Sequence, residues 1–174
     1  FDYLNAGQSA VETFTYRIVN SAGASAPITV TLNIAGANDA AVLGGVTAGA
    51  VSEDDEVTTA SGTVTISDAD AGQSALANPG TFQGVYGSLA LAADGTWTYT
   101  IDNSLGATQA LGADDSATES FAIASIDGTA ASAIAITVNG TNDIAAIAGD
   151  LEGSVTEDII SLETEAPLVT ASGQ

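Results

Sequence analysis

Large apolar residues alternate with small polar residues along most of this chain. Between positions 96 and 101, Trp97, Tyr99 and Ile101 occupy every second position, and threonines fill the positions between them. This period of two places the large side chains on one face of a strand, as a half-buried antiparallel sheet requires. The same pattern predicts further strands at 14–18, 28–34, 63–66, 89–91 and 134–138. The sequence therefore predicts an all-β protein built from antiparallel β-sandwiches.

The turns and the core follow from the same pattern. Asp94-Gly95 stands between two predicted strands, where both residues tolerate the left-handed backbone of a tight hairpin. Helix is poorly supported, and only the Ala-rich stretch 105–113 could supply a turn or two. The predicted core consists of the inward-facing residues Val64, Ile66, Leu89, Leu91, Trp97, Tyr99, Ile101, Phe121, Ile123, Ile134, Ile136 and Val138.

The chain also repeats itself at a long interval. Residues 36–39 (GAND) return as 140–143 (GTND), and residues 50–54 (AVSED) return as 154–158 (SVTED), both 104 residues further on. A period near one hundred residues is the size of a whole β-sandwich domain. We therefore expect three units: residues 1–37 as the C-terminal part of one repeat, 38–141 as a complete repeat, and 142–174 as the N-terminal part of the next.

Charge narrows the possible partners. The chain has 22 acidic residues against one basic residue, Arg17, and a formal net charge of −21. Such a chain repels nucleic acid and anionic membranes, and divalent cations are its natural counter-charge. Because 45% of the residues are hydrophobic and only 13% charged, we expect a folded chain rather than a disordered one. No apolar run approaches the ~18 residues that a membrane-spanning helix needs, so no membrane insertion is expected.

Acidic and amide side chains cluster near the predicted ends of the units. Carboxylate and carboxamide oxygens are the ligands that Ca²⁺ prefers, usually six to eight of them, and such flexible oxygen cages suit Mg²⁺ less well. Asx turns or a solvated charge run would explain any one cluster alone. Their recurrence at predicted domain ends favours calcium. The candidate ligands are Asn38, Asp39, Glu53, Asp54, Asp68, Asp70, Asn142, Asp143, Glu157 and Asp158.

Four motifs together resemble the VCBS repeats of large RTX-type bacterial surface adhesins. They are GTND at 140–143, SVTED at 154–158, DADAG at 68–72 and ADGTWTY at 93–99. The resemblance implies tandem immunoglobulin- or cadherin-like sandwiches that form an extended rod, calcium at the linkers, and export by type I secretion to the cell surface, where such adhesins serve biofilms. It also implies that Asn38, Asp39, Glu53, Asp68 and Asp70 act at one linker, with Asn142, Asp143 and Glu157 repeating the role. The proline common after Asn-Asp in such repeats is replaced by Ala41 and Ala146.

The leading functional prediction is therefore a structural stalk repeat of a secreted adhesin, with calcium stiffening its linkers. Its partners would be neighbouring repeats and, through distal modules, surface glycans or other cells. Two alternatives are a subunit that forms filaments by strand complementation and a calcium-dependent glycan-binding module. Catalysis is not expected, because a chain without His, Cys or Lys retains only carboxylate-pair chemistry. Asp94-Gly95-Thr96 and Asp127-Gly128-Thr129 match hairpin turns better than an acid dyad.

Overall fold

The computed structural model describes residues 1–144 and 149. Two predicted ligands, Glu157 and Asp158, lie outside these residues. The described part contains strands, turns and bends but no helix, and no segment of it could cross a membrane as a helix. Phe1–Asn142 form one compact unit, which contains a β-sandwich and a preceding β-hairpin.

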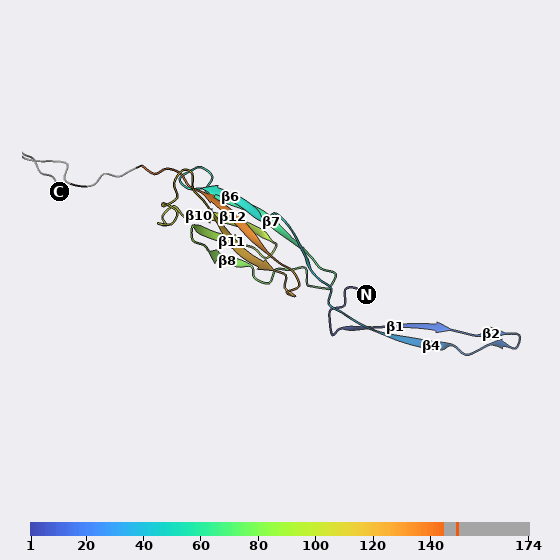
Figure 1. Ribbon diagram of the computed structural model, residues 1–174. Helices are drawn as coiled ribbons and strands as arrows, with labels where there is room; N and C mark the ends of the chain where they lie inside the picture. The colour runs from blue at the N-terminus through green and yellow to red at the C-terminus, as the bar shows by residue number, and fades with distance from the viewer. Residues whose placement is uncertain (145–148, 150–174) are drawn as a thin grey trace, which may run out of the picture. The chain divides into compact units, whose positions relative to one another are not determined.

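Two sheets form the sandwich. The first contains five strands in the order β5-β7-β10-β9-β8, and the second contains three in the order β11-β12-β6 (Figure 1). All pairs are antiparallel except β12 with β6, which are parallel. The strands are β5 (Val42–Gly45), β6 (Ala48–Ser52), β7 (Thr59–Ser67), β8 (Gly80–Gln83), β9 (Gly87–Leu91), β10 (Thr96–Ile101), β11 (Ser116–Ala124) and β12 (Ala131–Asn139).

The core lies between these two sheets. Eleven of the twelve residues predicted to face inward are buried in it, and the twelfth, Ile66, packs against it while partly buried. Trp97 is 2% exposed, and its indole N–H donates a hydrogen bond of 2.8 Å to the carbonyl of Val46. One carboxylate, Glu119, is buried at the margin of the core beside the hydroxyl of Tyr99. Burial raises the pKa of this hydroxyl, and the neighbouring carboxylate raises it further.

The N-terminal hairpin contains two small two-stranded sheets that are separate from the sandwich. It pairs β1 (Ser9–Tyr16) with β4 (Ile28–Ala35), and β2 (Val19–Asn20) with β3 (Gly23–Ala24) nearer its tip. The alternation noted in the sequence is present here too, but most large residues of this hairpin are exposed, and Val30 and Ile34 are only partly buried.

The structure contains the tight hairpin expected at Asp94-Gly95 and local turns in the Ala-rich stretch 105–113. Gly95 has a φ of +85°, and Asp94 accepts hydrogen bonds from the N–H and hydroxyl of Thr96, which lower the pKa of its carboxyl group. The predicted hairpin between β9 and β10 is therefore confirmed. The stretch 105–113 forms turns but no helix, as expected. The N–H groups of Thr108 and Gln109 both donate to the carbonyl of Leu105, and that of Leu111 donates to the carbonyl of Thr108.

The all-β sandwich prediction is confirmed. A tandem rod of such sandwiches stays a prediction, because the described residues contain one complete sandwich.

Candidate metal centres

The candidate ligands of the sandwich fall into two groups at opposite ends of β7. β7 begins beside the end of β6, where the N–H of Ser52 donates to the carbonyl of Val57. It ends beside the start of β5, where Ser67 pairs with Val42. A nine-residue strand spans about 25 Å, so ligands near its two ends cannot share an ion.

The first group, here called the Asp70 end, contains Asp39, Asp68 and Asp70. One oxygen of Asp70 (Oδ2) accepts the backbone N–H of Asp39 at 2.8 Å, and the N–H of Asp70 donates to Asp68 Oδ1 at 2.8 Å. Asp70 is only 2% exposed. Its other oxygen, Oδ1, and the Oδ2 of Asp68 are buried and have no hydrogen-bond partner. The Asp-Ala-Asp run therefore holds two buried carboxylate oxygens with unused lone pairs.

Asn5 adds an oxygen to this end that the sequence did not indicate. Its side-chain N–H₂ donates to the carbonyl of Ala71 at 3.4 Å, and its Oδ1 is buried without a partner. The N–H of Ala71 in turn donates to the carbonyl of Tyr3 at 3.1 Å. The loop before β1 thus touches the Asp-Ala-Asp loop. No sequence signal marks Asn5, because the repeat has glycine, Gly112, at the equivalent position.

Asp127 is a second functional candidate that the sequence analysis missed. It lies in the turn between β11 and β12 and accepts hydrogen bonds from Ser125 Oγ, from Thr129 Oγ1 and from the side-chain amide of Asn38 at 3.2 Å. These donors, Ser125 foremost, lower the pKa of its carboxyl group. The same Nδ2 of Asn38 donates to the Asp39 carbonyl at 2.7 Å. An Asp-Gly-Thr motif between two strands, interpreted only as a turn, was the available signal.

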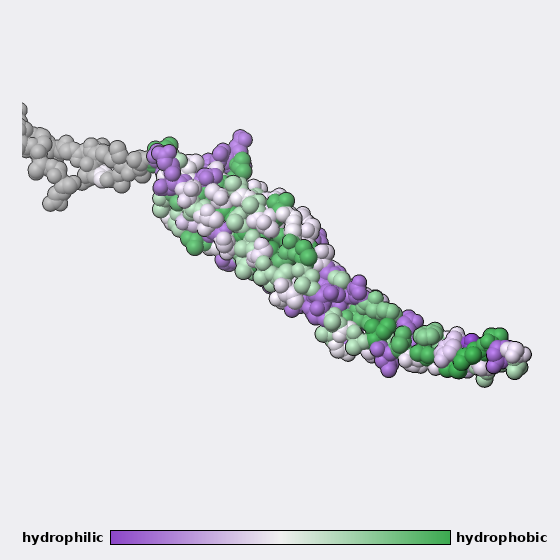
Figure 2. All heavy atoms as spheres, turned by 45° about the vertical axis from the view of Figure 1, so that its right-hand side comes forward, coloured by the Kyte–Doolittle hydropathy of each residue, from purple (hydrophilic) through white to green (hydrophobic). Residues whose placement is uncertain are grey.

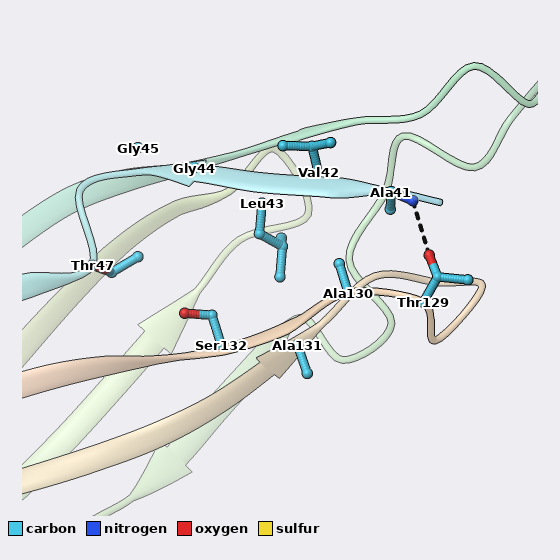
Figure 3. A pocket seen from close by; sticks show the side chains of 10 residues that line it. All are labelled: Ala41, Val42, Leu43, Gly44, Gly45, Thr47, Thr129, Ala130, Ala131 and Ser132. Carbon is cyan, nitrogen blue, oxygen red and sulfur yellow. Dashed lines mark hydrogen bonds between the residues drawn. The ribbon is translucent and has the colours of Figure 1, made fainter. Parts of the chain in front are cut away.

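Thr129, in the same turn as Asp127, binds the backbone just after the Asn38-Asp39 linker. Its hydroxyl oxygen accepts the N–H of Ala41 at 2.8 Å, the bond drawn in Figure 3. Beside it lies a groove between β5 and the start of β12. The ten residues that line the groove carry no ionisable side chain. We therefore infer that the Asp127–Thr129 turn fixes the direction of the Asn38-Asp39 linker. The described residues that line the groove indicate no chemical role.

Asp127 gives a testable dependence on pH. Its pKa is lowered in the folded state, so its contribution to stability is present above the ordinary aspartate value of about 4 and is lost as pH falls towards the folded value. Asp127→Asn should therefore lower the urea midpoint of unfolding at pH 7. The difference from the parent chain should shrink steadily as the pH is lowered from 4 to 2.5. A difference that is constant from pH 7 to 2.5 would contradict the assignment.

The second group, here called the Glu53 end, is centred on a fully buried carboxylate. Glu53 is 0% exposed, and its Oε1 accepts the N–H of Thr141 at 2.8 Å. Its backbone N–H donates to the carbonyl of Asn139 at 3.0 Å, and its Oε2 is buried without a partner. Asp54 is exposed, with a φ of +50°. Asn142 and Asp143 follow in the chain directly after Thr141, and both are exposed.

This arrangement corrects the predicted grouping of Glu53. The resemblance placed Glu53 with Asn38, Asp39, Asp68 and Asp70 at one linker, whereas the structure places it beside Thr141, at the opposite end of β7 from Asp70. The physical reason is topological. β6 runs parallel to β12, so the residue after β6 reaches the end at which β12 finishes. Glu53 therefore belongs with the linker that follows the sandwich, not with the one that precedes it.

Each end gathers oxygen donors without forming a complete metal site. Within residues 1–144 and 149, no three acidic side chains converge as a metal-binding group. The donors present are hard oxygens, and buried ones lacking partners lie at both ends, which fits Ca²⁺ better than softer metals. A complete shell of six to eight ligands would need further oxygens from backbone carbonyls, water or an adjoining module.

Comparison with known families agrees with this architecture. The model of the bacterial cadherin-like domain matches residues 38–140. The chain belongs to this family. No curated protein shows significant similarity to it. Bacterial cadherin-like domains are typically structural or adhesive modules rather than enzymes, and we interpret the cadherin-like sandwich described above in that sense.

Proposed function

We propose that this cadherin-like chain is a stalk segment of a secreted bacterial adhesin, in which Ca²⁺ bound between successive sandwiches stiffens the joints. Three features support the proposal: the family, the strongly acidic composition, and the placement of buried carboxylates at both ends of one sandwich. The VCBS-like motifs support the adhesin context and export by type I secretion. The partners would be neighbouring repeats, with adhesion to glycans or other cells left to distal modules.

The single observation that carries the proposal is the set of buried carboxylate oxygens without hydrogen-bond partners. Asp70 Oδ1, Asp68 Oδ2 and Glu53 Oε2 are of this kind at the two ends, and a fourth, Glu119 Oε2, lies at the margin of the core. A buried polar atom without a partner costs about 1–3 kcal/mol, and a charged one costs more. A bound cation would remove that cost at each end. Without the ion, each folded sandwich would bear this cost. Calcium is therefore expected to stabilise the folded state as well as to stiffen the joints.

The two ends of the sandwich would supply different oxygen ligands to an ion bound between modules. The Asp70 end would supply Asp68, Asp70 and Asp39, with Asn38 oriented by Asp127. The Glu53 end would supply Glu53 and the linker residues Asn142 and Asp143. In a tandem array, the Glu53 end of one module would meet the Asp70 end of the next. By the 104-residue repeat, Glu157 and Asp158 would then serve the joint after the third unit.

Calcium removal tests the proposal. With free Ca²⁺ at about 100 times the dissociation constant, one site adds about 2.7 kcal/mol to the free energy of unfolding. We expect the melting temperature to rise in calcium, and magnesium at the same ionic strength to have a smaller effect. The measurement is a calorimetric melt in calcium, in magnesium and in chelator, combined with small-angle scattering of a chain of several repeats. Identical melts and identical scattering-derived lengths in calcium and chelator would refute the proposal.

A further inference from the structure

The β1–β4 hairpin exposes several large apolar side chains on one face. Phe14 is 52% exposed, Tyr16 45% and Leu32 49%. Figure 2 shows hydrophobic residues gathered along this hairpin. The opposite face carries mostly polar residues, such as Thr13 and Thr29, together with Val11, which is 60% exposed. An isolated two-stranded hairpin is marginal in water, and contiguous apolar patches on soluble proteins usually mark an interface.

The register of this hairpin is the same as that of β11–β12 in the sandwich. Phe14 pairs with Val30 as Phe121 pairs with Ile134, and all eight residue pairs of β1–β4 match pairs of β11–β12. The match holds although the two strands are offset by different intervals, 107 and 104 residues. The three extra residues of the hairpin lie between the paired strands, in the segment that holds β2 and β3. The hairpin is thus a structural copy of the pair that closes the sandwich.

The end of the hairpin is also copied. The N–H of Gly36 donates to the carbonyl of Gln8 at 2.8 Å, and the N–H of Gly140 donates to the carbonyl of Asp115 at 3.0 Å. These two bonds occupy equivalent positions in the repeat. Equivalence therefore extends from the strands to the segment that leads into the linker, where Ala37 corresponds to Thr141.

The strands that cover the β11–β12 pair in the sandwich have no counterpart on the β1–β4 hairpin within the part of the chain that the structure describes. In the sandwich, the equivalents of Phe14, Leu32 and Ile34 are Phe121, Ile136 and Val138, which are at most 7% exposed. They are covered by β7, β9 and β10, and β6 runs parallel along the outer edge of β12. The corresponding edge of β4 has no strand beside it in the described residues.

The buried carboxylate of Glu119 shows a further contact that a covering module would make. Glu119 accepts the backbone N–H groups of Val85 and, at 2.7 Å, Tyr86. A Cβ at Gly84 would overlap Glu119 Oε2, so the glycine leaves room for the carboxylate in its present position. Glu12 occupies the equivalent position in the hairpin, opposite Leu32 as Glu119 is opposite Ile136, and it is exposed. The hairpin thus presents an acceptor that fits a pair of N–H groups in such a turn.

We propose that the apolar face of the β1–β4 hairpin is the docking surface for the body of a like module, equivalent to residues 38–110 of this chain. The body would place a strand like β6 parallel to β4, a turn like 84–87 on Glu12, and a carboxylate like Glu53 on the N–H of Ala37. This inference rests on the tandem arrangement of the proposed function, and none of its contacts requires calcium.

A fusion tests the proposal. Residues 38–110 are joined directly in front of Leu4 of the otherwise intact chain, so that the hairpin can complete a second sandwich. Backbone hydrogen exchange is followed in chelator, which separates this test from that of the calcium sites. We expect the amides of β1 and β4 to exchange about 100-fold or more slowly than in the unfused chain. Amides of β10 should be unchanged.

Matched variants show which face is used. In the fusion, Leu32→Asp should abolish the new protection, whereas Thr31→Asp on the opposite face should retain it. Glu12→Ala should reduce the protection, and Glu12→Gln should reduce it less, since an amide oxygen still accepts N–H bonds. Exchange of β1 and β4 that is as fast in the fusion as in the unfused chain would overturn the proposal.

Discussion

Asp70→Asn is expected to weaken calcium binding at the Asp70 end about 10-fold or more, a loss of about 1.4 kcal/mol. The variant removes one negative charge from the proposed ligand set. Asparagine can still accept the N–H of Asp39, the bond that Asp70 Oδ2 makes, so the loop should keep its conformation. Affinity would be measured by calcium titration calorimetry, and folding by circular dichroism in chelator.

The matched control is Asp114→Asn. Asp114 is exposed and precedes β11, whose start pairs with the end of β12 at the Glu53 end, and its replacement changes the net charge by the same amount. We expect it to leave the affinity of the Asp70 end unchanged. Equal losses in the two variants would mean that calcium responds only to total charge, which would contradict a specific site. A variant that binds calcium as tightly as the parent chain would remove Asp70 from the ligand set.

Trp97→Ala is expected to have the largest effect on stability, about 3–5 kcal/mol. The ring is buried at the centre of the core, so its loss leaves a cavity. It also removes the indole N–H that satisfies the carbonyl of Val46. For a domain of about one hundred residues, the melting temperature should fall by about 12 °C or more. Urea unfolding followed by far-ultraviolet circular dichroism measures the change.

Two further variants separate the contributions of this side chain. Trp97→Phe retains much of the apolar volume but loses the hydrogen bond, so its cost should be smaller than that of alanine. Thr98→Ser alters the neighbouring exposed position and should change stability by about 0.5 kcal/mol or less. A loss for Trp97→Ala no greater than that for Thr98→Ser would contradict the assignment of Trp97 to the core.

Much of the fold could be predicted from local patterns. The alternation around Trp97, Tyr99 and Ile101 identifies both the strand and its buried face, because a strand with one buried face has a period of two. Asp94-Gly95 identifies the turn before this strand, because both residues tolerate the backbone of a tight hairpin. The exposed face of the β1–β4 hairpin could not be predicted in this way, because alternation shows which side chains share a face but not what covers that face.

The candidate sites were harder to predict, because they depend on how distant segments meet. The acidic motifs identified Asp70 and Glu53 as unusual, and both are buried. Their grouping was wrong, since nearness in sequence does not show that β6 and β7 carry these residues to opposite ends of the sandwich. Asp127 was missed because its motif has a sufficient local explanation as a turn. Its contact with Asn38, 89 residues away in sequence, is visible only in three dimensions.

The most direct test of the central claim is a crystal structure of the chain grown in calcium, with the ion located by its anomalous scattering. The account predicts an ion 2.3–2.6 Å from Asp70 Oδ1, with Asp68 and Asp39 contributing further oxygens. An Asp70 carboxylate that meets only water or protein donors at millimolar calcium would contradict the account.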